Sequence, residues 1–226
     1  MAQHLQKEIE KLKKSILHLG AAVEESVRLA VRAIDNRDVA LAEQVISSDN
    51  DIDQAEVDLE EDCLKILALH QPVAIDLRFI IAVLKINSDL ERIGDLAVNI
   101  AERVQSLSAQ PTVRIPFDLQ GLTEKTQAML RQSLDSLVHL DAAVARKVCY
   151  ADDEVDAINR AMYDLVKDAI RKHPEQLDVL IPHLSISRYL ERIADHATNI
   201  AEDVIYMVEG VISRHKNEEL STGLGQ

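Results

Sequence analysis

The sequence predicts an all-α fold of six long helices arranged as two tandem three-helix bundles, and three observations support this prediction. Hydrophobic residues make up 47% of the 226 residues, but only six Gly and five Pro are available to interrupt long elements. Apolar residues recur at steps of three and four, which is the period of an α-helix. The block LERIGDLAVNIAE at 90–102 returns as LERIADHATNIAE at 190–202 with ten identical positions, which indicates an internal duplication.

Three helices are expected in the first half of the chain. Apolar residues at helical spacing predict the first helix over 5–34. Asp38 is a typical N-cap, so a second helix is expected over about 39–69. Pro72 lacks an amide donor and disfavours helix at the preceding residue, so the turn between two helices should lie there. The third helix should then run over about 75–107.

The second half repeats this pattern after a break. The segment SAQPTVRIPFD has two prolines and no helical period, so we expect a linker at 109–118 between bundles at 1–108 and 119–226. Asp141 lies 103 positions after Asp38, and Pro174 lies 102 positions after Pro72. We expect Pro182 to kink the sixth helix or to delay its start. The C-terminal tail NEELSTGLGQ is expected to be mobile.

Charge and composition restrict the class of partner. The formal charge of −14 and the 3% of aromatic residues do not suit a nucleic-acid binder, which needs a positive field and often stacking rings. The N-terminus has no signal-peptide core, and the longest apolar run, FIIAVL, is too short to span a bilayer. We therefore expect a cytoplasmic protein without a nucleic-acid partner, which meets the membrane only through other proteins. Cys63 and Cys149 are isolated and are expected to be reduced thiols.

The repeated block carries a polar stripe that faces away from the apolar stripe of its own helix. On a wheel of about 100° per residue, the four polar positions that begin at Glu91 fall within roughly 80° of one another. The preceding helix of each repeat carries a second stripe, and Asp53 and Asp95 are equidistant from the predicted turn at Pro72. Both stripes therefore lie at one level, roughly 30 Å from the hairpin tip. Whether they face each other depends on helix rotation, which the pattern leaves open.

These stripes predict metal sites. Like charges at i and i+4, such as Glu91 and Asp95, cost a few tenths of a kcal/mol, and Arg92 offsets only part of this. Hard oxygen ligands suit Mg²⁺, Mn²⁺, Ca²⁺ or iron. We expect divalent or iron cations (Fe, Mg, Mn or Zn), possibly multinuclear, and no organic cofactor; the alternative is a solvated acidic face. The candidate ligands are Asp49, Asp53, Glu56, Glu91, Asp95, Asn99 and Glu102 in repeat one, and Asp152, Asp156, Asn159, Glu191, Asp195, Asn199 and Glu202 in repeat two.

The segment HQPVAIDLRFIIAVLKINSDLERIGDLAVNIAE resembles the signature of the PhoU family of phosphate-signalling regulators. The segments LERIADHATNIAED, DNDIDQAEVD and DDEVDAINR resemble its other motifs, so the similarity covers about 5–215. It implies two three-helix bundles, with metal clusters in some members. Repeat two has Asn159 and Tyr163 in place of Glu56 and Glu60, which puts equal metal affinity in doubt. The family's Glu/Asp-x-x-x-Asp motifs match Asp49 with Asp53, Glu91 with Asp95, Asp152 with Asp156, and Glu191 with Asp195.

The resemblance also implies a function. It suggests a negative regulator of phosphate uptake and phosphate-starvation signalling, which acts as an adaptor between the ATPase subunit of a phosphate ABC transporter and a sensor histidine kinase. We also expect a homodimer. An enzyme is not expected, because Glu-x-x-His, Gly-x-x-x-x-Gly-Lys and Gly-x-Ser-x-Gly motifs are all absent from the sequence. The alternatives are a metal-independent helical scaffold and a chaperone-like adaptor.

Overall fold

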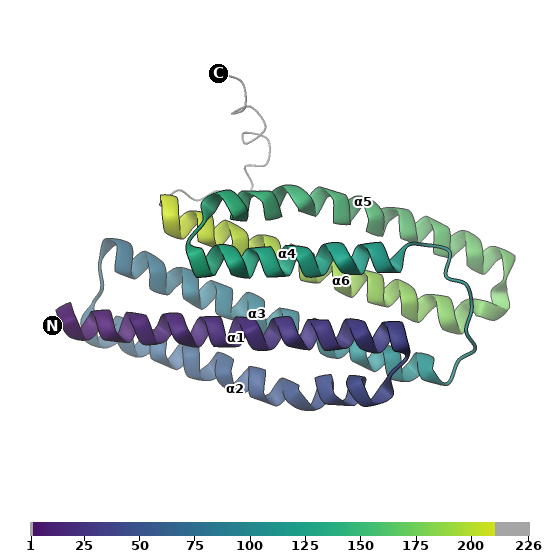
Figure 1. The fold of residues 1–226 in the computed structure, drawn as a ribbon, viewed down its shortest axis with the longest axis horizontal. Coiled ribbons are helices and arrows are strands. Elements are labelled where there is room, and N and C mark those ends of the chain that lie inside the picture. The colour runs from purple at the N-terminus through teal and green to yellow at the C-terminus, as the bar shows by residue number, and fades with distance from the viewer. Residues whose placement is uncertain (1, 211–226) are drawn as a thin grey trace, which may run out of the picture.

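The computed structural model describes residues 2–210, and within them it contains no β-strand. This confirms the predicted all-α fold. The C-terminal tail that was expected to be mobile lies beyond the described residues. The elements are α1 (Ala2–Asn36), α2 (Val39–His70), α3 (Ala74–Ser108), α4 (Leu119–His139), α5 (Ala142–Lys172), a short 3₁₀ helix η1 (Pro174–Gln176) and α6 (Leu177–Glu209) (Figure 1).

Capping residues set the helix starts where the sequence predicts them. The carboxylate of Asp38 accepts hydrogen bonds from two backbone amides in the first turn of α2, at 3.0 and 3.1 Å. Asp141 does the same for α5, at 2.9 and 3.1 Å. The expectation that Pro182 delays the sixth helix is wrong, because α6 already begins at Leu177 and includes Pro182. Near a helix start, a proline removes only one amide donor, so the preceding turn can still form.

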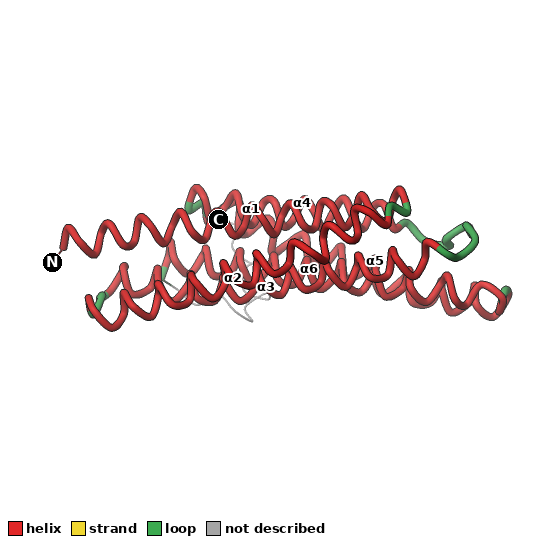
Figure 2. Tube along the Cα trace, turned by 90° about the horizontal axis from the view of Figure 1, so that it is seen from below, coloured by secondary structure: helices red, strands yellow, loops and turns green. Residues whose placement is uncertain are grey.

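The helices form two layers. In Figure 1, α2, α3, α6 and α5 follow one another in that order, and Figure 2 shows α1 and α4 together on one side of them. Helix α1 packs against α2 and α3, α4 packs against α5 and α6, and α3 packs directly against α6. Each repeat is therefore a three-helix bundle, as predicted, and the α3–α6 contact joins the two.

The core consists of the aliphatic stripes that the sequence period identifies. The covering helix α1 buries Leu12, Ile16, Leu19 and Val23 almost completely. Burial of one such side chain stabilises the fold by about 1.5–3 kcal/mol. Within residues 2–210, no helix has an apolar stretch long enough to cross a lipid bilayer. The central helices contribute Ile86, Leu90, Ile93 and Ile100 from α3, and the equivalent Ile186, Leu190, Ile193 and Ile200 from α6.

Polar contacts also cross the α3–α6 interface. Asp89 of α3 lies 2.8 Å from Nδ1 of His196 and accepts a hydrogen bond from the amide of Asn199 at 3.1 Å. Four residues earlier on α3, Lys85 forms an ion pair at 3.2 Å with Asp203, whose side chain is almost fully buried. Because the earlier residue on α3 meets the later one on α6, the two helices run antiparallel.

Candidate functional site

The acidic stripes lie in the α2–α3 groove and in the α5–α6 groove. Helix α1 covers the α2–α3 groove and helix α4 covers the α5–α6 groove, both from the same side of the layer formed by α2, α3, α6 and α5. The acidic side chains in the grooves are partly exposed, so they must lie on the opposite, uncovered side. Both sets therefore open on the same side of the four-helix layer. We call Asp49, Asp53, Glu56, Glu91 and Asp95 the repeat-one acidic face, and Asp152, Asp156, Glu191 and Asp195 the repeat-two acidic face.

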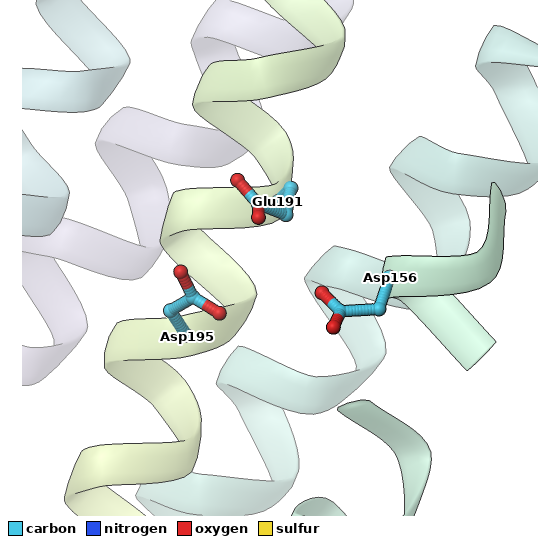
Figure 3. A group of neighbouring side chains, drawn as sticks. All are labelled: Asp156, Glu191 and Asp195. Atoms are coloured by element: carbon cyan, nitrogen blue, oxygen red, sulfur yellow. The ribbon is translucent and has the colours of Figure 1, made fainter. Parts of the chain in front are cut away.

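Three carboxylates of the repeat-two acidic face converge. Asp156 projects from α5 across the groove towards Glu191 and Asp195 of α6 (Figure 3). Each of the three offers a carboxylate oxygen, and these oxygens all lie within 4.8 Å of one another. Two oxygens bound to one cation at about 2.0–2.6 Å lie at most about 5 Å apart. The spacing of the three carboxylates therefore fits a shared cation.

Asp152 lies next to this cluster, and one of its carboxylate oxygens lacks a hydrogen-bond partner within the described part of the chain. Burial, followed by the charges of Asp195 and Asp156, raises the pKa of Asp152 to about 6. The hydroxyl of Thr198 is close enough to lower that pKa somewhat. Among the described residues, however, neither Oδ1 of Asp152 nor the Thr198 hydroxyl has a hydrogen-bond partner of good geometry, although both atoms are buried. A buried acceptor without a donor is the position that a metal ion would satisfy.

The pKa values of the neighbouring carboxylates on α6 are raised for the same reasons. Burial and the charges of Glu191 and Asp156 raise the pKa of Asp195 to about 6, while His196 and Arg192 act in the opposite direction. Burial also raises the pKa of Glu191, with Arg188 and Arg192 opposing it. The folded chain thus holds these carboxylates in an arrangement that disfavours their ionised forms.

The repeat-one acidic face is built in the same way. Burial and the charges of Asp53 and Asp95 raise the pKa of Asp49 to about 6. Burial and Asp95 raise the pKa of Glu91. Arg92 lies 3.4 Å from a carboxylate oxygen of Glu91 and 3.7 Å from one of Asp95. The partial neutralisation by Arg92 that the sequence suggested is therefore present in the structure.

Asn87 supports the repeat-one acidic face and was missed by the sequence analysis. Its buried amide donates to the backbone oxygen of Glu56 at 3.0 Å and to its carboxylate at 3.3 Å. In repeat two, Ser187 takes the equivalent place and donates to Oδ1 of Asn159 at 3.3 Å. Both members of the pair change together between repeats, and comparison of the two repeats at this position was the signal that could have found it.

Not every predicted ligand joins these clusters. The amide of Asn99 donates to the backbone oxygen of Asp95 in its own helix at 2.9 Å, while that of Asn199 is used at the α3–α6 interface. Glu102 is exposed, and Glu202 lies near Cys149, whose pKa burial raises to about 12. Of the other ten predicted ligands, nine make up the two acidic faces, and Asn159 borders the repeat-two face through Ser187.

Two comparisons place this architecture among known proteins. The family model described as "PhoU domain" matches the chain twice, at residues 16–104 and at residues 119–204. Among curated proteins, the phosphate-specific transport system accessory protein PhoU homolog of Aquifex aeolicus is 38% identical over 212 residues, which cover 93% of this chain and 96% of the relative. The homolog of the same name from Pseudomonas aeruginosa is 36% identical over 216 residues, which cover 95% of this chain and 89% of the relative.

Solved structures give the same result for the fold. The crystal structure of PhoU from Pseudomonas aeruginosa superposes with a TM-score of 0.89 at 36% identity, over 91% of this chain and 99% of the other. The phosphate transport system regulatory protein PhoU from Streptococcus pneumoniae superposes with a TM-score of 0.82 at 30% identity, over 92% of this chain and 98% of the other.

Proposed function

The chain belongs to the PhoU family, and from this membership we propose that it is a non-enzymatic accessory protein of a phosphate-uptake system. The proposed role is to lower phosphate uptake and phosphate-starvation signalling when phosphate is plentiful. The names of the relatives from Aquifex aeolicus and Pseudomonas aeruginosa, which are called phosphate-specific transport system accessory proteins, support the accessory part of this proposal. The observation that carries the proposal is the pair of acidic faces on the uncovered side of the four-helix layer.

Both acidic faces are proposed metal sites. In repeat two, Asp156, Glu191 and Asp195 would hold the cation and Asp152 would add a further oxygen; in repeat one, Asp49, Asp53, Glu91 and Asp95 would do so. A bound Fe, Mg, Mn or Zn ion would supply the positive charge that offsets the repulsion among these carboxylates. Asp156 and Asp195 come from different helices, so their joint use would fix the rotation of α5 relative to α6.

The proposed partners are the transporter's ATPase subunit and a sensor histidine kinase. The uncovered side of the four-helix layer would be the contact surface, and Arg92 and Arg192 would position the neighbouring carboxylates. The protein is proposed to act in the cytoplasm as a homodimer. It would act on a partner by binding one conformational state of that partner more tightly than another. Binding shifts the equilibrium between two states only by the difference in affinity for them.

The metal proposal is tested by elemental analysis of protein purified without chelator. The wild type is expected to retain metal and to melt at a higher temperature when the cation is added back after chelation. The Asp95→Ala/Asp195→Ala variant removes one carboxylate from each face and should lose both effects. Equal metal content and an equal response to cations in the wild type and the variant would contradict the metal proposal.

The regulatory role is tested by deletion of the gene. A phosphate-starvation reporter should become active in phosphate-rich medium in the deletion strain and should be silenced again when the wild-type gene is restored. A reporter that stays silent in the deletion strain would contradict the role, whatever the metal content of the protein.

A further inference from the structure

The two acidic faces differ in the residues that surround them. Repeat two has Arg160 and Arg188 at the positions that Val57 and Ser88 occupy in repeat one. It also has Tyr163 where repeat one has Glu60. The duplication keeps the central carboxylates and changes their surroundings from acidic to basic and aromatic. A shared metal site does not account for this difference.

The changed residues border a hollow between α5 and α6. Its volume is about 630 Å³, and Arg160, Arg188 and Arg192 all line it, together with Glu191 and Asp195. With Asp152 and Asp156, which lie in the same groove, repeat two has four carboxylates against these three arginines. Repeat one has six carboxylates against only Lys85 and Arg92 at the equivalent places, so the repeat-two groove is much less acidic than the repeat-one groove. The other residues that line the hollow are Asn159, Tyr163, Ile181, Leu184 and Ser185.

The three arginines make no close contact with a carboxylate of the described residues, although Arg188 and Arg192 act on the charge of Glu191 at longer range. Within residues 2–210, the side chains of Arg160, Arg188 and Arg192 have no ion-pair partner within 4 Å and no hydrogen-bond partner. Other arginines on these helices are paired: Arg171 lies 3.2 Å from Asp168, and Arg146 lies 2.6 Å from Glu209. An unpaired guanidinium is a strong donor for carboxylates, because its planar fork can make two parallel hydrogen bonds.

The hollow also has an apolar wall. Tyr163 is 59% exposed and Ile181 is 45% exposed, and Leu184 lies beside them. Exposed tyrosine and arginine together are typical of protein interfaces, where they contribute much of the binding energy. A small inorganic anion would use the arginines but not the apolar wall, so the combination favours a polypeptide.

We propose that this hollow, the arginine hollow of repeat two, is a docking site for a partner segment that carries carboxylates beside an apolar side chain. The proposal rests on the adaptor function above and names the chemistry of one partner surface. The chain carries a formal charge of −14, so an acidic partner would be repelled by most of its surface. Of the two grooves, the arginine hollow repels such a partner less and offers it three guanidinium groups, and binding there would fix the orientation of the complex.

The test measures binding of a fluorescein-labelled amphipathic helical peptide, with Glu residues on either side of a central Leu, to the full chain in the presence of chelator. Fluorescence anisotropy should report binding of the peptide to the wild type. The Arg160→Val/Arg188→Ser variant, which installs the repeat-one residues, should bind the peptide about tenfold more weakly, which corresponds to about 1.4 kcal/mol. Arg171→Ala, a change of another exposed arginine on α5, is the matched control and should leave the affinity unchanged. Circular dichroism checks that every variant is folded.

A charge-reversed pair sharpens the result. Arg160→Glu/Arg188→Glu should reject the Glu peptide and accept a peptide in which Lys replaces each Glu. Equal affinity of the Glu peptide for the wild type and for Arg160→Val/Arg188→Ser would overturn the proposal. So would an absence of peptide binding up to about 1 mM, with or without binding of inorganic phosphate to the same arginines. These results would leave the proposed function standing, because metal analysis and the reporter assay do not depend on the arginine hollow.

Discussion

Asp89 and His196 join the two repeats: Nδ1 of His196 lies 2.8 Å from Oδ1 of Asp89 across the α3–α6 interface, and both side chains are more than four-fifths buried. The amide of Asn199 donates to the same oxygen. A single carboxylate from repeat one is thus the acceptor for two side chains of repeat two. Leu96 and Tyr189 occupy the corresponding positions of the other repeat, so this contact occurs on one side of the duplication only.

Removal of that carboxylate should weaken the junction. Asp89→Ala is expected to lower the free energy of unfolding by about 1–3 kcal/mol, because the partly buried side chains of His196 and Asn199 lose their acceptor. Urea denaturation followed by circular dichroism measures this. Asp51→Ala, at an exposed position of α2, is the control and should change stability by less than about 0.5 kcal/mol. Equal losses in the two variants would contradict a specific role for Asp89.

The pair Asn87 and Glu56 should behave as a unit. Asn87→Ala is expected to cost about 1–2 kcal/mol, since the buried amide donates to two oxygens of Glu56. Glu56→Asn combined with Asn87→Ser installs the pair found in repeat two and should recover part of that loss. A double-mutant cycle measures the coupling, which is expected to be about 0.5–3 kcal/mol. Additive single changes would show that the two residues act independently.

The repeat-two acidic face should reduce stability in the absence of cations. The pKa of Asp152 is raised to about 6 from an ordinary value of 3.8, so the protonated form favours folding at low pH and this contribution to stability is lost as the pH rises through 6. At pH 7.5, Asp152→Asn should therefore raise the unfolding free energy of chelator-treated protein by about 1 kcal/mol, a figure already reduced for partial solvent exposure.

The same substitution should weaken the response to metal. Thermal melts of the wild type and Asp152→Asn, with and without added Mn²⁺, measure both effects together. We expect the variant to melt at a higher temperature than the wild type in chelator and to gain less from the cation. A variant that melts lower in chelator would show that Asp152 stabilises the free protein.

His183 should give the fold an acid-sensitive component. Burial lowers the pKa of His183 below its ordinary value of 6.5. A hydrogen bond with the backbone of Val179 opposes this shift, and the charge of Arg37 adds to it. The neutral buried histidine contributes to the free energy of unfolding above about pH 6.5. This contribution is lost as the pH falls, because the unfolded chain binds the proton more strongly than the folded chain does. The stability gap between the wild type and His183→Gln should therefore narrow from pH 7.5 to pH 5. A gap independent of pH would exclude this linkage.

The limits of the helices could be predicted from the sequence because local chemistry sets them. Asp38 caps α2 and Pro72 ends the helical pattern, so the expected ranges 39–69 and 75–107 differ from α2 and α3 by only one residue at any end. The level of the acids followed from the same reasoning, since an antiparallel hairpin places Asp53 and Asp95 at equal distance from its turn. Local signals and the helical period were sufficient for these features.

Helix rotation and the contact between repeats could not be predicted in this way. The rotation of α2 against α3 decides that Asn87 meets Glu56, and it depends on packing of the whole aliphatic core. The pairing of Asp89 with Asn199 joins residues 110 positions apart, for which no local pattern exists. Asn199 was therefore predicted as a ligand in the acidic stripe, although its amide is used at the junction.

The one-sided covering of the four-helix layer by α1 and α4 leaves both grooves open in the same direction. A rigid partner laid along that side would engage the molecule bivalently, and once one groove is bound, the second contact becomes intramolecular with an effective concentration in about the millimolar range. The avidity of such a complex would exceed the affinity of either groove alone. Damage to one groove would then reduce the residence time of the partner far more than a halving of the contact area suggests.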